Sequence, residues 1–394
     1  MSKTEIPSIR FRGFDDAWEQ RKAKELFVST ADKGYPELPV LSATQDRGMI
    51  RRDENSINIF HDKKNEAGYK RVLPGQFVIH LRSFQGRFAH SAIEGITSPA
   101  YTVFGFSEPE KHDSEYWKYV FTSKPFIQRL ETVTYGIRDG RSISYEEFLT
   151  LGFVYPSKAE QTAIARYLDK LSDLITLHQR KFEKLTNVKK SMLEKMFPQN
   201  GSCYPAVRFK GFTGPWERRK FGDVFEEYSE KNRADLPPLT IIQGSGTIRR
   251  DESERALQYD KASLSNYKVV NEGDLIVHLR SFEGGLEKAN SQGIISPAYH
   301  TFHGEGVDSR FYYTYFRSKN FIDTDLKPHV YGIRDGRSID VEGMKTIEIP
   351  FTSYPEQKLI GDAIDSINTL ISLQRRELEK LQSIKKSLLE KMFV

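Results

Sequence analysis

The chain has one cysteine, Cys203, among its 394 residues. A single thiol excludes a disulfide framework and fits the reducing interior of a cell. With no second cysteine and only 9 scattered histidines, the sequence has no zinc-site spacing. It also has no run of 18 apolar residues, and Met1–Arg12 lacks an apolar signal region. We therefore expect a cytoplasmic protein that does not bind a membrane.

The motifs of several enzyme classes are absent as well. The sequence contains no Gly-x4-Gly-Lys-Ser/Thr phosphate loop and no Asn-Pro-Pro-aromatic or Asp-Pro-Pro-aromatic run of an amino-methyltransferase. The segments 51–54 and 249–252, both Arg-Arg-Asp-Glu, combine acids and bases as a metal-dependent nuclease would, but the spaced Asp and Glu-x-Lys pattern is missing. A solvated turn is the favoured interpretation. We expect no catalytic residue, no metal site and no cofactor in this chain.

The sequence is a tandem duplication. Residues 7–14 and 18–22 recur at 205–212 and 216–220, and His80-Leu-Arg-Ser-Phe84 recurs as His278-Leu-Arg-Ser-Phe282. Tyr135-Gly-Ile-Arg-Asp-Gly-Arg-Ser-Ile143 returns as residues 331–339. Because the period is close to 197 residues, whole domains are duplicated, and we expect one chain to imitate a twofold dimer.

Each copy ends in a stretch with a seven-residue apolar repeat, at Glu160–Phe197 and Glu356–Phe393. The repeat positions are Ile164, Leu168, Leu171, Ile175, Phe182, Leu185, Met192 and Met196, then Ile360, Ile364, Ile367, Ile371, Leu378, Leu381, Leu388 and Met392. Five heptads without proline inside predict a long helix that packs on another helix as a coiled coil. About 38 residues would make a rod of roughly 57 Å, which suits a spacer.

Polar residues interrupt both repeats at matching places. His178 and Gln374 stand at the two centres, and Lys189 and Lys385 stand near the ends. We expect His178 and Gln374 to share one layer of the helix pair, because each would otherwise face hydrocarbon at a cost of about 1–3 kcal/mol. Such a layer fixes the register of the pair but fits a parallel and an antiparallel arrangement equally well.

The duplicated domains show mixed signals. Leu38–Ser42, Gln76–Leu81 and Tyr101–Phe104 are predicted strands, while Asp113–Phe121 and Lys124–Glu131 are predicted short helices. The chain is therefore predicted to be α+β, with two tandem-duplicated domains and two long helices. We place domain boundaries at 1–155, 156–200 with the linker Pro198–Ser202, 201–351 and 352–394.

The repeated loops favour binding over catalysis. Arg82 and Arg280 directly follow apolar strands, and a guanidinium fork fits guanine or phosphate. The net charge of +5 permits nucleic-acid binding without demanding it. The predicted DNA contacts are Gln45, Arg47, Arg51, Arg52, Arg82, Ser83, Phe84, Gln85, Arg87, Tyr135, Arg138 and Arg141, then Gln243, Arg249, Arg250, Arg280, Ser281, Phe282, Tyr331, Arg334 and Arg337.

Two of these loops have an alternative interpretation. The loop around Arg138, Asp139 and Arg141 fits equally well as a structural turn that an Arg–Asp pair closes. The loop tips Gln45–Gly48 and 85–90 differ from Gln243–Gly246 and 283–288, as expected for domains that read related but unequal targets. Ordinary drift of surface loops would produce the same differences.

Taken in order and doubled, these motifs resemble the DNA specificity subunit of a bacterial type I restriction-modification system. The resemblance is carried by residues 10–14 with 18–22, the helix entries 156–161 and 355–357, and the endings 189–197 and 385–393. It covers essentially the whole chain. The second helix entry, 352–357, has fewer prolines than many members of that family have.

The resemblance implies two target-recognition domains, each reading half of a bipartite site in double-stranded DNA, and two helices packed antiparallel. It also implies two methyltransferase subunits and ATP-driven restriction subunits as partners. S-adenosylmethionine, ATP and Mg would bind those partners. Because a twofold relation inverts strand polarity, we expect an imperfect inverted repeat as target, with a spacer set by helix length.

Two rival hypotheses remain at this stage. In the first, the partner is a single chain that both methylates and cleaves. In the second, the duplicated domains bind peptides, and the protein is an interaction scaffold.

Overall fold

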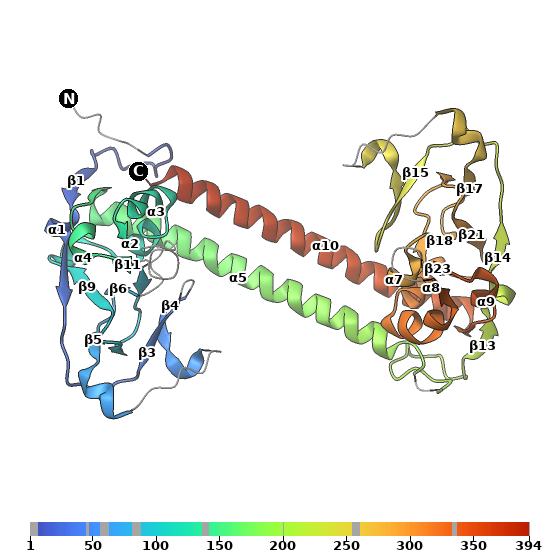
Figure 1. Ribbon diagram of the computed structural model, residues 1–394, viewed down its shortest axis with the longest axis horizontal. Coiled ribbons are helices and arrows are strands. Elements are labelled where there is room, and N and C mark those ends of the chain that lie inside the picture. The colour runs from blue at the N-terminus through green and yellow to red at the C-terminus, as the bar shows by residue number, and fades with distance from the viewer. Residues whose placement is uncertain are drawn as a thin grey trace. The chain divides into compact units, whose positions relative to one another are not determined.

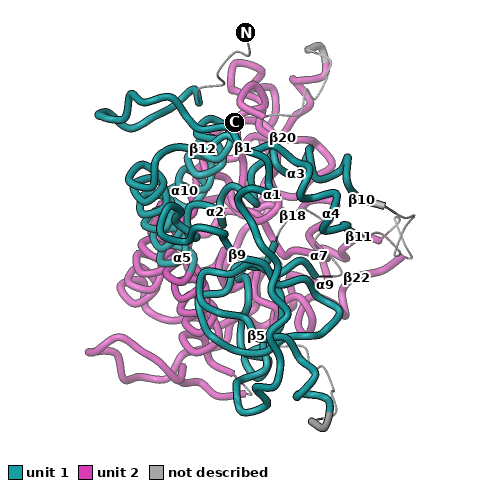
Figure 2. The backbone as a smooth tube through the Cα atoms, turned by 90° about the vertical axis from the view of Figure 1, so that its left-hand side faces the viewer, with its two compact units in different colours: residues 1–179, 376–394 teal, residues 180–375 magenta. Residues whose placement is uncertain are grey.

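The computed structural model describes residues 7–44, 47–55, 63–80, 88–135, 142–199, 201–253, 261–332 and 337–393. The chain forms two compact units (Figure 2). Unit 1 comprises Met1–Gln179 and Arg376–Val394, and unit 2 comprises Arg180–Arg375. Each unit therefore holds one of the two duplicated domains together with part of each long helix. The domain boundaries predicted above stay a prediction.

Unit 1 begins with short strands and ends with short helices (Figure 1). Its domain elements are β1 (Glu19–Lys22), α1 (Ala23–Leu26), β2 (Phe27–Thr30), β3 (Leu41–Thr44), β4 (Gly48–Arg51), β5 (Lys70–Val72), β6 (Phe77–Ile79), β7 (Ala89–His90), β8 (Gly95–Thr97), β9 (Thr102–Phe106), α2 (Ser114–Val120), α3 (Lys124–Glu131), β10 (Thr134–Tyr135), β11 (Ser142–Ile143), α4 (Tyr145–Phe148) and β12 (Gly152–Tyr155).

The domain of unit 2 follows a matching order. Its elements are β13 (Glu217–Lys220), α6 (Phe221–Val224), β14 (Glu226–Tyr228), β15 (Leu239–Ile242), β16 (Gly246–Arg249), β17 (Lys268–Val270), β18 (Leu275–Val277), α7 (Ser281–Gly284), β19 (Glu287–Lys288), β20 (Gly293–Ile295), β21 (His300–His303), α8 (Ser309–Phe316), a π-helical turn (Phe321–Leu326), β22 (Val330–Tyr331), β23 (Ser338–Ile339), α9 (Val341–Lys345) and β24 (Glu348–Phe351).

The sheets of the two units correspond one to one. A four-stranded antiparallel sheet in the order β2-β9-β6-β7 in unit 1 matches β14-β21-β18-β19 in unit 2. The antiparallel pairs β1-β12, β3-β4, β5-β8 and β10-β11 match β13-β24, β15-β16, β17-β20 and β22-β23. The predicted α+β class and the internal duplication are confirmed. The strands and short helices predicted for unit 1 are found as β3, β6, β9, α2 and α3, with small shifts at their ends.

An aromatic core joins each sheet to its helices. In unit 1, Phe27 contacts Phe104 of the sheet, Trp117 of α2 and Phe148 of α4, with ring centroids 5.2–5.6 Å apart. In unit 2, Phe221 contacts Phe302 and Phe316 at 5.1 and 5.4 Å. Aromatic rings bury large apolar areas, so these clusters dominate the stability of each unit.

Two long helices follow the domains, α5 (Lys158–Lys195) and α10 (Tyr354–Lys391), with 38 residues each (Figure 1). All the apolar repeat positions are buried or half-buried, whereas most of the residues between them are exposed. His178 and Gln374 are half-buried on the same faces, and their role in setting the register stays a prediction. None of the helices in the described ranges has a stretch long and apolar enough to cross a membrane.

The direction of the helix pair can be read within each unit. Ile164 and Leu168, near the start of α5, share the core of unit 1 with Met392 and Phe393, at the end of α10. In unit 2, Met196 and Phe197, just after α5, pack with residues near the start of α10, Ile360 and Ile364. The start of one helix therefore lies beside the end of the other, and the packing is antiparallel.

A glutamine at the start of each long helix binds the neighbouring domain. Gln161 accepts a hydrogen bond from the backbone N–H of Asp113 at 2.9 Å and donates one to the carbonyl oxygen of Pro156 at 2.9 Å. Gln357 repeats this arrangement with Asp308 and Thr352, at 3.0 and 2.7 Å. Asp113 and Asp308 are the N-caps of α2 and α8. The Glu-Gln dipeptide of each helix entry thus joins helix and domain.

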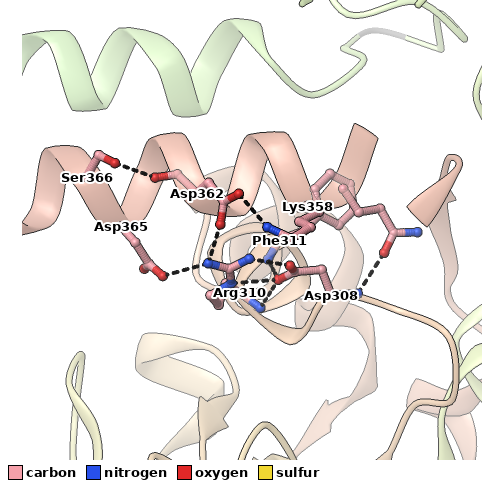
Figure 3. A network of polar contacts seen from close by, with 8 residues as sticks. Asp308, Arg310, Phe311, Lys358, Asp362, Asp365 and Ser366 are labelled. Atoms are coloured by element: carbon pink, nitrogen blue, oxygen red, sulfur yellow. Dashed lines mark hydrogen bonds and ion pairs between the residues drawn. The ribbon is translucent and has the colours of Figure 1, made fainter. Parts of the chain in front are cut away.

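In unit 2, an arginine fixes α8 against α10 (Figure 3). The guanidinium of Arg310 donates to Asp308 at 2.6 Å, to Asp362 at 2.7 Å and to Asp365 at 3.2 Å. These three carboxylates raise the pKa of Arg310, with the hydrogen bond to Asp308 as the largest cause. Helix α8 also supplies side chains to the candidate nucleic-acid interface. Its contact with α10 therefore fixes the position of those side chains.

Candidate nucleic-acid interface

Much of the predicted interface of unit 1 lies outside the described residues. This applies to Gln45, Arg82, Ser83, Phe84, Gln85, Arg87, Arg138 and Arg141, and to Arg334 of unit 2. Tyr135 belongs to β10, but its side chain is not described. Arg47 and Arg51 are exposed on the β3-β4 hairpin, and Arg52 follows it half-buried. More of the predicted interface residues of unit 2 than of unit 1 lie within the described part of the chain.

The two arginines of the Arg-Arg-Asp-Glu segment differ in their environment. Arg249, at the end of β16, is exposed and pairs with the carboxylate of Asp251, with Nη2–Oδ2 3.0 Å. This pair lowers the pKa of Asp251, mainly through the hydrogen bond from Arg249. Arg250 is half-buried and lies over the ring of Tyr267, 5.3 Å from its centroid. Arg249 is thus the more exposed of the two arginines.

The acidic residues of this segment form no metal site. Within the described parts of the chain, no group of three or more His, Cys, Asp or Glu side chains is placed to hold a metal ion. The Asp251 carboxylate is engaged by Arg249. The solvated-turn interpretation of residues 249–252 agrees with this geometry.

The strand end after β18 is built by His278, Arg280 and Ser281. The hydroxyl of Ser281 accepts the backbone N–H of His278 at 2.8 Å, and the imidazole Nδ1 of His278 accepts the N–H of Arg280 at 3.3 Å. Ser281 is fully buried, so it holds this turn and does not face solvent. Arg280 is exposed. Burial, with smaller contributions from Arg317 and Arg280, lowers the pKa of His278 to about 4.

Helix α7, which follows Arg280, contacts two other predicted loops. Phe282 lies under the guanidinium of Arg337, which is 4.5 Å from the ring centroid, and Arg337 is 3.5 Å from the Glu283 carboxylate. Gly284 of the same helix lies against the side chain of Gln243. The turn between β15 and β16, helix α7 and the β22-β23 hairpin therefore meet at one surface.

This surface, which we call the α7 surface, is formed by Gln243, Arg280, Phe282, Glu283 and Arg337. Tyr331 is 59% exposed on β22. Arg249 and Arg250 lie at the opposite end of the β15-β16 hairpin, because Leu239 pairs with Arg249 and Ile242 pairs with Gly246. Three residue steps along a strand span about 10 Å, so the structure separates these two arginines from the α7 surface.

Sequence reasoning missed the residues that hold the β15-β16 turn. The carboxylate of Glu287, which is fully buried, accepts the backbone N–H groups of Gly244 and Gly246 at 2.7 and 3.1 Å. The same carboxylate accepts from the hydroxyl of Tyr313 at 2.9 Å and from the guanidinium of Arg317. The available signal was the difference between residues 85–90 and 283–288, where Glu287 stands opposite Ala89.

Sequence comparison places these features among known proteins. No family model matches the chain. The chain is 22% identical to the type I restriction enzyme MjaX specificity subunit assigned in Methanocaldococcus jannaschii, and the similarity covers 98% of this chain and 94% of that protein. It is also 26% identical to the MjaVIII specificity subunit of the same organism, over 59% of each chain.

Structural comparison agrees at the level of the fold. The crystal structure of the type I restriction-modification system S subunit from M. genitalium superimposes with a TM-score of 0.58 and 12% identity, covering 99% of both chains. The chain is therefore similar over almost its whole length to type I specificity subunits, and the resemblance found in the sequence is confirmed.

Proposed function

We propose that this chain is the sequence-specific DNA-binding subunit of a type I restriction-modification complex, and that it reads a bipartite target without performing catalysis. The supporting observation is the doubled architecture, in which every sheet of unit 1 has a counterpart in unit 2. Two related domains in one polypeptide suit two related half-sites. The full-length similarity to a specificity subunit points the same way.

The α7 surface and Arg249 are the proposed DNA contacts of unit 2. An exposed arginine can donate a bidentate pair of hydrogen bonds to guanine or to phosphate, and Gln243 can do so to adenine. The counterpart of Arg249 in unit 1 is Arg51, which is also exposed, and Arg47 is exposed on the same hairpin. Because the turn tips of the two units differ in sequence, the half-sites should be related words on opposite strands and not identical ones.

The long helices are proposed to bind the methyltransferase partners. Leu174 and Leu177 of α5 are 45% and 60% exposed, and their counterparts on α10, Leu370 and Leu373, are 48% and 49% exposed. Leucines three residues apart lie on one face of a helix. Equivalent exposed pairs on the two helices suit two copies of one partner, each docking on an equivalent face.

Catalysis would then belong to the partners, in the cytoplasm. Methyltransferase subunits would bind S-adenosylmethionine and methylate adenine, and restriction subunits would use ATP and Mg to cleave. Helix length would set the spacer between half-sites, because 38 residues correspond to roughly 57 Å and one DNA turn to about 34 Å.

The test is methylation mapping in a host that carries this chain with its methyltransferase partner. We expect one bipartite motif with a fixed spacer and a related half-site on each strand. The proposal is refuted if this chain directs no new methylation in the host and if, in a gel-shift experiment, the chain with its partner binds no duplex of a random library. Removal of one heptad from both helices should shorten the spacer, and an unchanged spacer would contradict the role of helix length.

A further inference from the structure

Two glycines form the turn between β15 and β16 in unit 2, and its backbone requires them. Gly244 has φ +87° and Gly246 has φ +78°. A Cβ at Gly246 would collide with the carbonyl oxygen of Lys288 and the side chain of Asn290. Positive φ values are unfavourable for other residues, and glycine leaves a turn free to adopt several conformations. A contact from elsewhere in the domain to the backbone of this turn would therefore restrict it to one conformation.

Glu287 supplies that partner from β19, about 40 residues further along the chain. Its two carboxylate oxygens accept the N–H groups of Gly244 and Gly246 at 2.7 and 3.1 Å. The side chain of Asn290 adds bonds to the carbonyl oxygens of Ser245 and Thr247, at 2.7 and 3.0 Å. Both backbone donors of the turn glycines are therefore tied to one buried acid.

Residues of α8 and its C-cap compensate the energetic cost of burying the Glu287 carboxylate. Arg317 is ion-paired to Glu287, and the hydroxyl of Tyr313 donates to it at 2.9 Å. Burial, together with the charge of Glu287, raises the pKa of Tyr313, so its hydroxyl keeps the proton that it donates. A carboxylate that is fully buried persists in a protein when it is paired and hydrogen-bonded in this way.

The described residues beside the corresponding turn of unit 1 offer different chemistry. Ala89 stands in place of Glu287, and the alignment of residues 121–124 with 316–319 places Thr122 opposite Arg317. There the hydroxyl of Thr44 donates to the carbonyl oxygen of Gly48 at 2.8 Å and accepts the N–H of Arg47 at 3.1 Å. Ile242 stands in place of Thr44 in unit 2 and offers no such hydroxyl. The contacts of Thr44 and those of Glu287 therefore involve different residue types in the two units.

We propose that Glu287 is the positioning residue that fixes the β15-β16 turn for recognition of one half-site, and that Thr44 serves the other turn. Gln243 is next to the clamped glycines, and its side chain lies against Gly284 of α7, on the same surface as Arg280 and Arg337. This inference rests on the proposed DNA-reading function. Specificity depends on a side chain meeting its base at a defined position.

The experiment uses the full chain in complex with its methyltransferase partner and the bipartite motif that methylation mapping defines. Methylation rates are measured on duplexes with single substitutions in either half-site, for the wild type, Glu287→Gln and Thr44→Val. We expect Glu287→Gln to lower discrimination by roughly tenfold at one half-site and to leave the other unchanged. Thr44→Val should act on the opposite half-site only.

Two further variants separate positioning from general damage. Glu227→Gln removes a partly buried acid of unit 2 that pairs with Lys345 at 2.7 Å and does not touch the turn, and it should keep discrimination at both half-sites. The double variant Glu287→Gln with Arg317→Met removes the partly buried cation together with its partner, so it should fold and still lose discrimination at the same half-site as Glu287→Gln.

The inference is overturned if the Glu287→Gln variant discriminates between bases at both half-sites as well as the wild type does. The inference is also overturned if the variant loses discrimination equally at both half-sites and has a lower melting temperature, because that result indicates a structural role for Glu287. A wild-type complex that methylates no duplex would instead refute the proposed function itself.

Discussion

The guanidinium of Arg10 donates two hydrogen bonds to the carboxylate of Glu160, 150 residues later, with Nε–Oε1 2.7 Å and Nη2–Oε2 2.8 Å. The pair recurs between Arg208 and Glu356 at 2.6 and 2.8 Å. Both glutamate side chains are only 1% exposed. Each pair ties the segment before β1 or β13 to the start of a long helix. The motifs that carried the family resemblance at residues 10 and 160 are thus two halves of one contact.

Breaking this pair should destabilise unit 1. Glu160→Gln keeps the side-chain volume but leaves the Arg10 guanidinium, itself only 15% exposed, without its counter-charge. Loss of one partner of a buried pair costs about 3–5 kcal/mol, and chemical denaturation should show a fall of that order. Glu131→Gln, at an exposed position of α3, is the control and should change nothing measurable. Equal stability of both variants would contradict the prediction.

The pH dependence of stability should contain a contribution from His278. Its folded pKa of about 4 lies below the ordinary value of 6.5, so the folded state holds fewer protons between these values. Its contribution is complete above pH 6.5 and is lost as the pH falls towards 4, by on the order of 1–3 kcal/mol. Denaturation of His278→Gln across this range should give a shallower pH profile than the wild type. The prediction is wrong if the free energy of unfolding of His278→Gln changes with pH as steeply as that of the wild type.

The adjacent arginines Arg249 and Arg250 should have separable roles. Arg249→Ala removes an exposed charge and should weaken DNA binding. It should also reduce the dependence of the binding constant on salt concentration and leave the melting temperature unchanged. Arg250→Ala removes the contact with Tyr267 and should lower stability by roughly 1 kcal/mol. Binding titrations at several salt concentrations and thermal melting distinguish the two.

Arg233→Ala is the matched control for Arg249→Ala. Arg233 pairs with Asp235 at 2.8 Å, two residues on, as Arg249 pairs with Asp251. It lies outside the predicted contacts and should leave DNA binding unaltered. If both alanine variants weaken binding equally, net charge and not position is responsible.

The exposed leucines of the long helices should be required for the partner and not for folding. Leu177→Glu and Leu373→Glu each place a charge on an exposed face, so the isolated chain should melt as the wild type does. Co-purification with the methyltransferase subunit should be reduced in each variant and lost in the double variant. Lys170→Glu, also exposed on α5, serves as the control for added charge. Retention of the partner by the double variant would exclude this docking face.

Features repeated along the chain were predictable from sequence. The duplication is visible as repeated motifs. The long helices and their apolar seams are visible in the local spacing of apolar residues, because burial on a helix follows a period of 3.5–3.6 residues whatever the partner is. The strands near Gln76 and Tyr101 were recognisable for a similar reason, since β-branched and aromatic runs bounded by turn residues favour them.

What the tertiary structure alone decided is how polar groups far apart in sequence are paired. No spacing rule joins Arg10 to Glu160, or Glu287 to Gly244 and Arg317, because a buried charge is satisfied by whatever donors the fold brings to it. The polar layer at His178 and Gln374 suits either direction of the helix pair, and only the family resemblance implied the antiparallel one. The direction was settled by the packing of Ile164 with Met392 and of Ile360 with Met196 within the two cores.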